Sequence, residues 1–462
     1  MDKHPKFAVV GHPNKGKSSI VSTLAQDENI AISSVPGTTT KNRSFPLIVD
    51  GKILYELYDT PGFQRARAIL AWLKKEPTPA NKRADRVAKF VFENENNPRF
   101  ADDIELLKPI INGAGVVYVV DGSKPYGPEY EAEMEILRWS GQPSMALINL
   151  IGEDDYKLEW QKALDHYFKI VRVFNPMKAT FSQILELLEA MAELKYEWRT
   201  TIKESIEVLK IYQKQKIKNS AIVLSDTLIK ALTYKKEIKG SLTHFQKEEA
   251  VENFKKEIEG FEEKAYSKIA QIWNHSSLER EIKKESLIDI NLFSKESSLI
   301  FGLDKKDLIK KAALAGAITG SSFDILLGGH SLFLGTTMGA LIGGGGALFG
   351  IDKLQNSALI KGSPFSSKKV TIVGPIKDLN FPFILLRRLI YFTKEIANRP
   401  HANRAKLSID QEKLFERDWI DDEIQKRLLS LHLNFINNRK IQESKEEYIN
   451  LVEKILLKYI EH

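Results

Sequence analysis

The chain has 462 residues, a formal net charge of +7 and no cysteine. This length suits two or three domains, and the missing cysteines exclude a disulfide scaffold and zinc sites with thiolate ligands. A chain without disulfides suits a reducing cytoplasm, and the first residues lack the charged and apolar pattern of a signal peptide. The excess positive charge is spread among many acids, so it is weak evidence for an anionic partner.

A phosphate-binding loop is predicted directly after an apolar strand at 7–10. The loop has the spacing G-x-x-x-x-G-K-S and leads into a helix. Glycines let successive backbone N–H groups turn toward phosphate oxygens, and the positive end of the helix dipole lies beneath them. In this pattern Lys17 reaches the β- and γ-phosphates, and the Ser18 hydroxyl binds Mg²⁺. The predicted nucleotide contacts of the loop are Gly11, Pro13, Asn14, Lys15, Gly16, Lys17, Ser18 and Ser19.

Two further motifs fall where a nucleotide-dependent switch needs them. The polar stretch 36–40 carries Thr39, whose hydroxyl is a candidate ligand of the metal. A hairpin is predicted around Asp50-Gly51, a dipeptide typical of two-residue turns, and its second strand ends in the sequence DTPG. Asp59 of that sequence is placed to hold Mg²⁺ through water, and the Gly62 N–H is placed to contact the γ-phosphate.

The motifs GHPNKGKS, PGTTT and DTPG resemble the Era/TrmE branch of the translation-factor-class GTPases. The resemblance covers about the first 200 residues and implies a P-loop NTPase G domain of α/β class, with a mostly parallel sheet and flanking helices. It implies that Lys17 and Gly62 contact the phosphates. It also implies that Ser18, Thr39 and Asp59 serve the Mg²⁺ ion. Lys17, Thr39 and Gly62 are therefore the candidate catalytic residues.

The residue after Gly62 departs from a pattern that Ras-like enzymes share. Phe63 stands where those enzymes carry the glutamine that orients the attacking water. Some relatives with an apolar residue there use a K⁺ ion, held partly by the asparagine that corresponds to Asn14. The resemblance therefore implies K⁺-stimulated hydrolysis, and a very slow intrinsic rate is the alternative.

The base-reading motif is incomplete. In the family an N-K-x-D sequence follows a later strand, and its aspartate accepts two hydrogen bonds from guanine N1 and N2. Asn149 keeps the first position, but Leu150 and Gly152 replace the lysine and the aspartate. The acids that follow are candidates to read the base from a shifted register, or else they form a solvated helix start; they are Glu153, Asp154 and Asp155. GTP is favoured by the resemblance, and ATP or relaxed specificity is the alternative.

The predicted G domain spans residues 1–200 and contains an enlarged second switch at 63–112. Its further predicted strands are 45–49, 53–58, 115–121, 145–148 and 170–174. Its predicted helices after the first are 66–75, 81–94, 101–111, 129–139 and 180–198. A helical region at 201–305 follows, rich in Lys and Glu, and is either a solvated bundle or a partner-binding helix.

A glycine-zipper hairpin is predicted at 306–365. The stretch 312–350 contains no Lys or Arg and suits two helices of about 17 to 19 residues, and its glycines recur at four-residue spacing. These glycines are Gly316, Gly320, Gly335, Gly339 and Gly343. The hairpin is predicted to enter or lie on a membrane, or to be exposed in one nucleotide state. The alternative is a hairpin buried in a soluble domain, which Asp324 favours because a lone charge in lipid is costly.

The C-terminal part, 366–462, is predicted to be mainly helical, with a strand at 370–373 and helices at 381–397, 409–433 and 444–460. Together with the glycine-rich hairpin it resembles a domain of unknown function found behind such G domains in bacterial proteins. That resemblance implies no activity.

These observations predict a GTPase that hydrolyses GTP to GDP and phosphate with Mg²⁺ and K⁺ and acts as a conformational switch. Its predicted partners are GTP and GDP, a membrane surface or membrane protein through 312–350, and a second copy as a homodimer. A cytoplasmic location, peripheral to or inserted in the inner membrane, is expected. The alternatives are an RNA- or ribosome-associated assembly factor with little turnover, and a structural protein with a degenerate nucleotide site.

Overall fold

The computed structural model of the chain describes residues 4–26, 43–49, 51–240, 242–275, 291–303, 352–354, 370–403 and 420–460. The predicted first switch at 36–40 and the glycine-rich stretch 312–350 lie outside these residues. The chain divides into two compact units, one of residues 1–213 with 398–405 and one of residues 214–397 with 406–462.

A six-stranded sheet forms the centre of the first unit, in the order β2-β3-β1-β4-β5-β6. Its strands are β1 (Lys6–Val10), β2 (Arg43–Val49), β3 (Lys52–Asp59), β4 (Gly115–Asp121), β5 (Ser144–Asn149) and β6 (Val171–Val173). Neighbouring strands are parallel except β2 and β3, whose hairpin ends on the pair Val49 and Lys52. The predicted hairpin and the mostly parallel sheet are thus confirmed.

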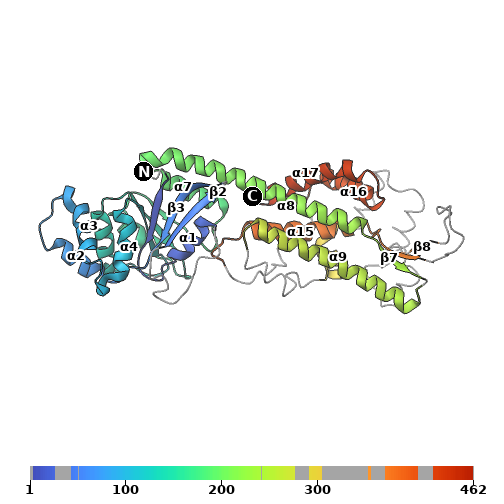
Figure 1. Cartoon of the computed structure of the whole chain (residues 1–462), viewed down its shortest axis with the longest axis horizontal. Coiled ribbons are helices and arrows are strands. Elements are labelled where there is room, and N and C mark those ends of the chain that lie inside the picture. The colour runs from blue at the N-terminus through green and yellow to red at the C-terminus, as the bar shows by residue number, and fades with distance from the viewer. Residues whose placement is uncertain are drawn as a thin grey trace. The chain divides into compact units, whose positions relative to one another are not determined.

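Helices cover both faces of this sheet, because its central strands are apolar on both sides. On one face Ala8 and Tyr118 pack against the helices of the enlarged second switch and the two helices that follow β4 and β5. On the other face Phe7 and Val119 pack against the helix after the phosphate loop and the last helices of the unit. Figure 1 shows α2, α3 and α4 together beside the sheet. The helices are α1 (Lys17–Ala25), α2 (Ala66–Lys74), α3 (Arg83–Glu93), α4 (Ala101–Ile111), α5 (Glu131–Trp139), α6 (Lys157–Leu164) and α7 (Phe181–Ala192).

The helix predicted at 180–198 is shorter in the structure. A capping box between Thr180 and Gln183 starts α7, which ends at Ala192, and a 3₁₀ turn, η4 (Tyr196–Trp198), follows. The Trp198 ring packs edge-on against Phe7, with 4.9 Å between ring centroids. The last predicted turn is thus a separate 3₁₀ turn that places Trp198 against β1.

The second unit consists of helices and one small sheet. Its helices are α9 (His244–Ile272), α11 (Lys295–Phe301), α15 (Phe381–Ala397), α16 (Asp422–Ile436) and α17 (Ile441–Ile460), and α8 (Arg199–Thr233) contributes residues to both units. In the core of this unit, α15 is buried along most of its length, and it lies beside α9 in Figure 1. Core residues come from α8, α9, α15, α16 and α17, so this unit has a hydrophobic core of its own.

Two predictions for this unit need correction. The stretch 201–305 is not helical throughout, because β7 (Lys236–Lys239) forms an antiparallel sheet with β9 (Val370–Val373), which also pairs with β8 (Asp352–Leu354). The helix predicted at 409–433 is not continuous, because Asp421 is extended and α16 starts at Asp422. Ile420 is buried there, and its carbonyl oxygen accepts a hydrogen bond from Gln425 Nε2 at 2.9 Å. Residues 409–419 lie outside the described residues.

Candidate nucleotide-binding site

The phosphate loop connects β1 to α1, as the sequence predicts. Gly16 precedes α1 in the left-handed region, with φ of 85°, and a Cβ atom there would lie 2.3 Å from Nδ2 of Asn149. A side chain at this position is therefore excluded by both the backbone and the space. Asn14 also has a positive φ, 61°, and is exposed at the tip of the loop. Ser19 is buried in the first turn of α1.

The Lys17 side chain is buried and directed toward the loop itself. Its Nζ atom donates to the carbonyl oxygens of His12, at 3.0 Å, and Gly11, at 3.3 Å. Burial lowers the pKa of Lys17 to about 8, although the nearby Asp59 carboxylate acts in the opposite direction. The ammonium group is thus held against the backbone of the loop.

Ser18 and Asp59 lie in contact. The Ser18 hydroxyl donates to Asp59 Oδ2 at 2.7 Å, although the two residues are 41 positions apart. They meet because β3, which ends in Asp59, pairs in parallel with β1, which leads into the loop. Both offer oxygen atoms, the ligand type that Mg²⁺ prefers, and Mg²⁺ commonly takes only one or two protein ligands beside phosphates and water. The Ser18 and Asp59 oxygens therefore suit a magnesium site of that kind.

Gly62 packs directly on the loop. A Cβ atom at Gly62 would lie 2.5 Å from the backbone nitrogen of Pro13, so only glycine fits there. The next residue, Phe63, donates its backbone N–H to the carbonyl oxygen of Gly11 at 3.2 Å, and its ring is buried. The second switch therefore begins in contact with the phosphate loop. Thr39 of the first switch lies outside the described residues.

Asn149 joins the base-reading loop to the phosphate loop. Its Nδ2 atom donates to the carbonyl oxygen of Lys15 at 3.1 Å. Glu153, Asp154 and Asp155, the acids that follow, are exposed. Asp155 accepts from the backbone N–H of Lys157 at 3.0 Å and pairs with its ammonium group at 2.9 Å, as expected of an acid at a helix start.

Two buried acids near the loop were missed at the level of sequence. Glu133 on α5 is 2% exposed, and its oxygens meet His12 Nδ1 at 2.9 Å and the Tyr118 hydroxyl at 3.0 Å. Asp103 on α4 accepts from the backbone N–H groups of Gln64, at 2.9 Å, and Arg65, at 3.2 Å. Burial raises the pKa of Asp103 to about 6. In the sequence each of these acids is visible only as a charged residue among the apolar positions of a helix. That pattern does not reveal which group the acid contacts.

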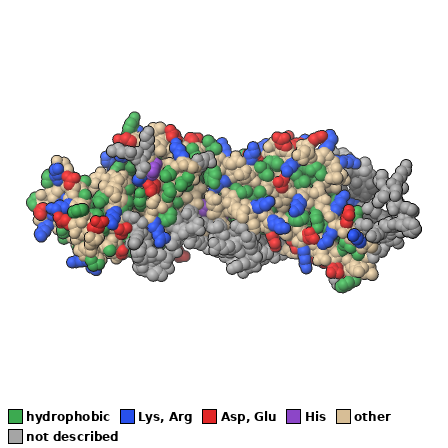
Figure 2. Space-filling model, in the orientation of Figure 1, with side chains coloured by type: hydrophobic (Ala, Val, Ile, Leu, Met, Phe, Trp, Pro, Cys, Tyr) green, Lys and Arg blue, Asp and Glu red, His purple; other side chains and the backbone are tan. Residues whose placement is uncertain are grey.

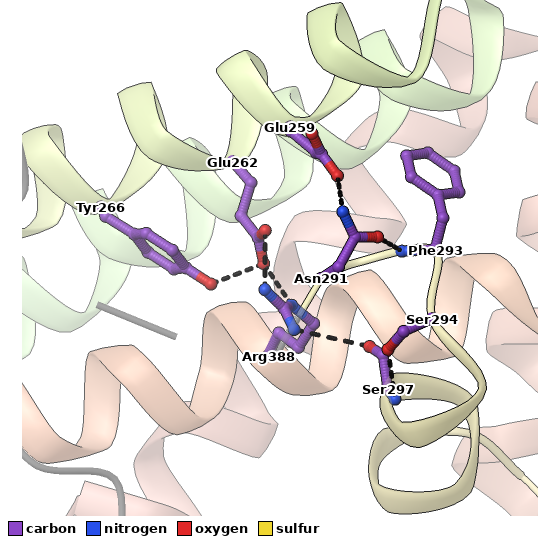
Figure 3. Close-up of polar contacts among 8 residues, drawn as sticks. All are labelled: Glu259, Glu262, Tyr266, Asn291, Phe293, Ser294, Ser297 and Arg388. Carbon is purple, nitrogen blue, oxygen red and sulfur yellow. Dashed lines mark hydrogen bonds and ion pairs between the residues drawn. The ribbon is translucent and has the colours of Figure 1, made fainter. Parts of the chain in front are cut away.

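The second unit holds a separate buried polar cluster (Figure 3). Glu262 on α9 pairs with Arg388 on α15 through contacts of 2.6 and 3.0 Å, and Tyr266 donates to the same carboxylate. Arg388 also donates to the Ser297 hydroxyl of α11 at 3.4 Å. The cluster links three helices, and both side chains of the ion pair are almost completely buried.

The fold and the loop geometry of the first unit define a P-loop GTPase domain. Residues 6–149 match the family model described as a 50S ribosome-binding GTPase. Residues 161–456 match the model described as a domain of unknown function, DUF3482, and the chain belongs to that family because the match covers more than half of it. The expectation of a P-loop GTPase domain followed by a domain of unknown function is thus confirmed.

Curated relatives are similar to part of this chain. The GTPase Der of Nitrosococcus oceani is 33% identical over 119 residues, 25% of each chain. The GTPase Der of Thermoanaerobacter sp. is 32% identical over 120 residues, 25% of this chain and 27% of the relative. The GTPase Der of Herminiimonas arsenicoxydans is 38% identical over 74 residues, 16% of each chain. The alignments therefore span only between 16% and 27% of the length of these relatives.

The described residues contain no helix that is long and apolar enough to cross a membrane. The predicted hairpin at 312–350 is not among them.

Proposed function

We propose that the first unit binds GTP with Mg²⁺ and hydrolyses it to GDP and phosphate, and that the second switch transmits the result. The observation that carries the proposal is the contact of Ser18 with Asp59 at 2.7 Å, beside a buried Lys17 and a glycine packed on the loop. Four predicted site residues from two separate motifs meet at one loop. The match of residues 6–149 to a GTPase family supports guanosine triphosphate as the substrate.

Each residue has a distinct role in the proposed reaction. Lys17 neutralises charge on the β- and γ-phosphates, and the backbone N–H groups of the loop hold their oxygens. Ser18, with Asp59 acting through water and Thr39 from the first switch, would hold Mg²⁺, which supplies further positive charge between the phosphates. Gly62 offers its N–H to the γ-phosphate. Hydrolysis then removes that contact and releases the second switch.

The attacking water must be positioned by a group other than the Phe63 side chain, which follows Gly62. Phe63 is apolar and its ring is 1% exposed, so it contributes to the core and offers no polar atom. We infer that K⁺ contributes, held partly by Asn14, which is exposed on the left-handed turn of the loop. A very slow intrinsic rate without a partner is the alternative.

A second candidate function is that of an RNA- or ribosome-associated assembly factor with little turnover. The description of the matched family as ribosome-binding favours it. Among the described residues on the face shown in Figure 2, charged side chains of both signs are mixed and form no continuous basic surface of the kind that binds RNA. A membrane surface that binds 312–350 and a second copy of the chain are the other proposed partners.

The test is phosphate release by the full chain with GTP and with ATP, each in KCl and in NaCl, beside Lys17→Ala. We expect turnover of GTP that is faster in KCl and at least 100-fold lower in Lys17→Ala. Equal rates in both salts would exclude the role of K⁺. Binding without turnover would favour the assembly factor, and no binding of either nucleotide would leave a structural protein.

A further inference from the structure

The loop that follows β5, residues 150–156, is fixed at two points on the segment after β4. The Gly152 N–H donates to the Ser123 hydroxyl at 2.9 Å, and the Tyr156 N–H donates to the carbonyl oxygen of Gly122 at 2.8 Å. Gly152 occupies the place of the aspartate that reads guanine in related enzymes. Its N–H group donates to Ser123, and glycine offers no carboxylate at this position.

A continuous set of polar contacts joins this loop to the phosphate loop. Lys15 Nζ pairs with Asp121 Oδ2 at 3.7 Å, and both side chains are less than a tenth exposed. Asp121 Oδ1 accepts from the hydroxyl and the N–H of Ser123, at 2.5 and 3.1 Å. Ser123 in turn accepts from Gly152. We call these four residues, Lys15, Asp121, Ser123 and Gly152, the Lys15 relay.

The neighbouring loop after β6 is held in place as well, and it adds apolar surface. Asn175 Nδ2 donates to the carbonyl oxygen of Leu150 at 3.0 Å, which fixes the two loops to each other. Ile151 in one loop is 53% exposed and Met177 in the other is 41% exposed. These side chains offer apolar contact to a flat base, and they distinguish one purine from another poorly because they form no hydrogen bonds with its edge.

We propose that the Lys15 relay holds the base-binding loop in position, and that the purine is recognised without a carboxylate, so guanine and adenine nucleotides bind with similar affinity. This inference rests on the proposed function, because it assumes a nucleotide at the phosphate loop. A carboxylate that accepts two hydrogen bonds would favour guanine strongly, because adenine would leave it unpaired. The Lys15 relay positions the loop without presenting a carboxylate that adenine would leave unpaired.

The first test measures the dissociation constants of GDP and ADP for the full chain by calorimetry. We expect the two constants to agree within tenfold, and a larger preference for GDP would overturn the inference while leaving the proposed function intact. Glu153→Gln and Asp154→Asn are expected to leave the affinity for GDP within twofold. A tenfold loss in either variant would show that this acid reads the base. Failure of both nucleotides to bind would overturn the proposed function together with the inference.

The second test separates positioning of the base loop from general stability. Ser123→Ala removes the centre of the Lys15 relay, and we expect GDP to bind at least fivefold more weakly while tripolyphosphate, which has no base, binds within twofold. Equal losses for both probes, or no loss for GDP, would overturn the role of the relay. Ser140→Ala is the matched control, because Ser140 is also buried and its hydroxyl contacts only near neighbours in the sequence among the described residues: it donates to the Leu137 carbonyl oxygen at 2.6 Å and accepts from the Gln142 N–H at 3.3 Å. Should Ser123→Ala not fold, Asp121→Asn tests the same step, since it keeps an acceptor for Ser123 and removes the charge opposite Lys15.

Discussion

The ammonium group of Lys17 is held in a buried position by carbonyl oxygens, and burial lowers its pKa to about 8. Phosphate binds the charged form, so nucleotide affinity should fall as the pH rises above 8, where the free protein must first take up a proton. We expect GDP to bind about tenfold more weakly at pH 9.5 than at pH 7.5, measured by calorimetry. Lys17→Arg stays charged and should show no such fall. A flat profile in the native chain would contradict the prediction.

One carboxylate oxygen of Asp103 accepts hydrogen bonds from the first residues of the second switch, and burial raises the pKa of Asp103 to about 6. The folded state therefore favours the protonated acid, whereas the unfolded chain ionises near pH 4. The contribution of Asp103 to the free energy of unfolding should be largest below pH 4 and should fall, by up to about 3 kcal/mol, as the pH rises through 6.

Asp103→Asn keeps the accepting oxygen and removes this titration. We expect Asp103→Asn to become more stable relative to the native chain as the pH rises from 4 to 7.5, measured by thermal unfolding. Asp85→Asn, a change at an exposed acid of α3, serves as control. A difference that does not depend on pH would contradict the assignment.

Packing between α9, α11 and α15 depends on the ion pair of Glu262 and Arg388, whose side chains are 5% and 3% exposed. Removing one partner leaves a buried charge, so Glu262→Gln should destabilise the second unit by about 3 to 5 kcal/mol. Hydrogen exchange of α9 and α15 would measure this as faster opening. The double change Glu262→Leu with Arg388→Met should recover much of the loss, because no charge is then left unpaired.

Glu252→Gln is the matched control on the same helix. Glu252 pairs with Lys255 at the surface, and exposed pairs contribute less than about 1 kcal/mol. Equal effects of the changes at 252 and 262 would contradict the importance of the buried pair.

Most secondary structure elements follow from local patterns, and those that do not are set by distant partners. β9 and α15 were predicted at their observed bounds, because an apolar run and an amphipathic pattern are visible in the chain. β7 was missed, because its four residues lie between two long helices and become a strand only by pairing with β9. The end of α7 at Ala192 was also missed, and the separate turn that follows it places Trp198 against Phe7 of β1.

The chain as a whole combines a GTPase domain with a second unit whose sequence contains the apolar stretch 312–350. We expect the full chain to co-sediment with anionic liposomes, and we expect the bound fraction to differ at least twofold between GDP and a GTP analogue. Leu332→Asp with Leu334→Asp should abolish binding, because charge in an apolar membrane segment is costly. Leu299→Asp, at an exposed position of α11, is the control. Recovery of all protein in the supernatant with both nucleotides would exclude a membrane partner.

The amino-acid sequence was sufficient to predict the phosphate loop, the two switch motifs and the incomplete base-reading motif, because each of these is a short local pattern. Only the folded chain brings Ser18 to Asp59, gives Glu133 and Asp103 their partners, and connects Lys15 to Gly152 through Asp121 and Ser123. The Glu262 to Arg388 pair likewise joins residues 126 positions apart. The reason is physical: hydrogen bonds and ion pairs act over a few ångströms, and which distant groups come that close is decided by strand order and helix packing.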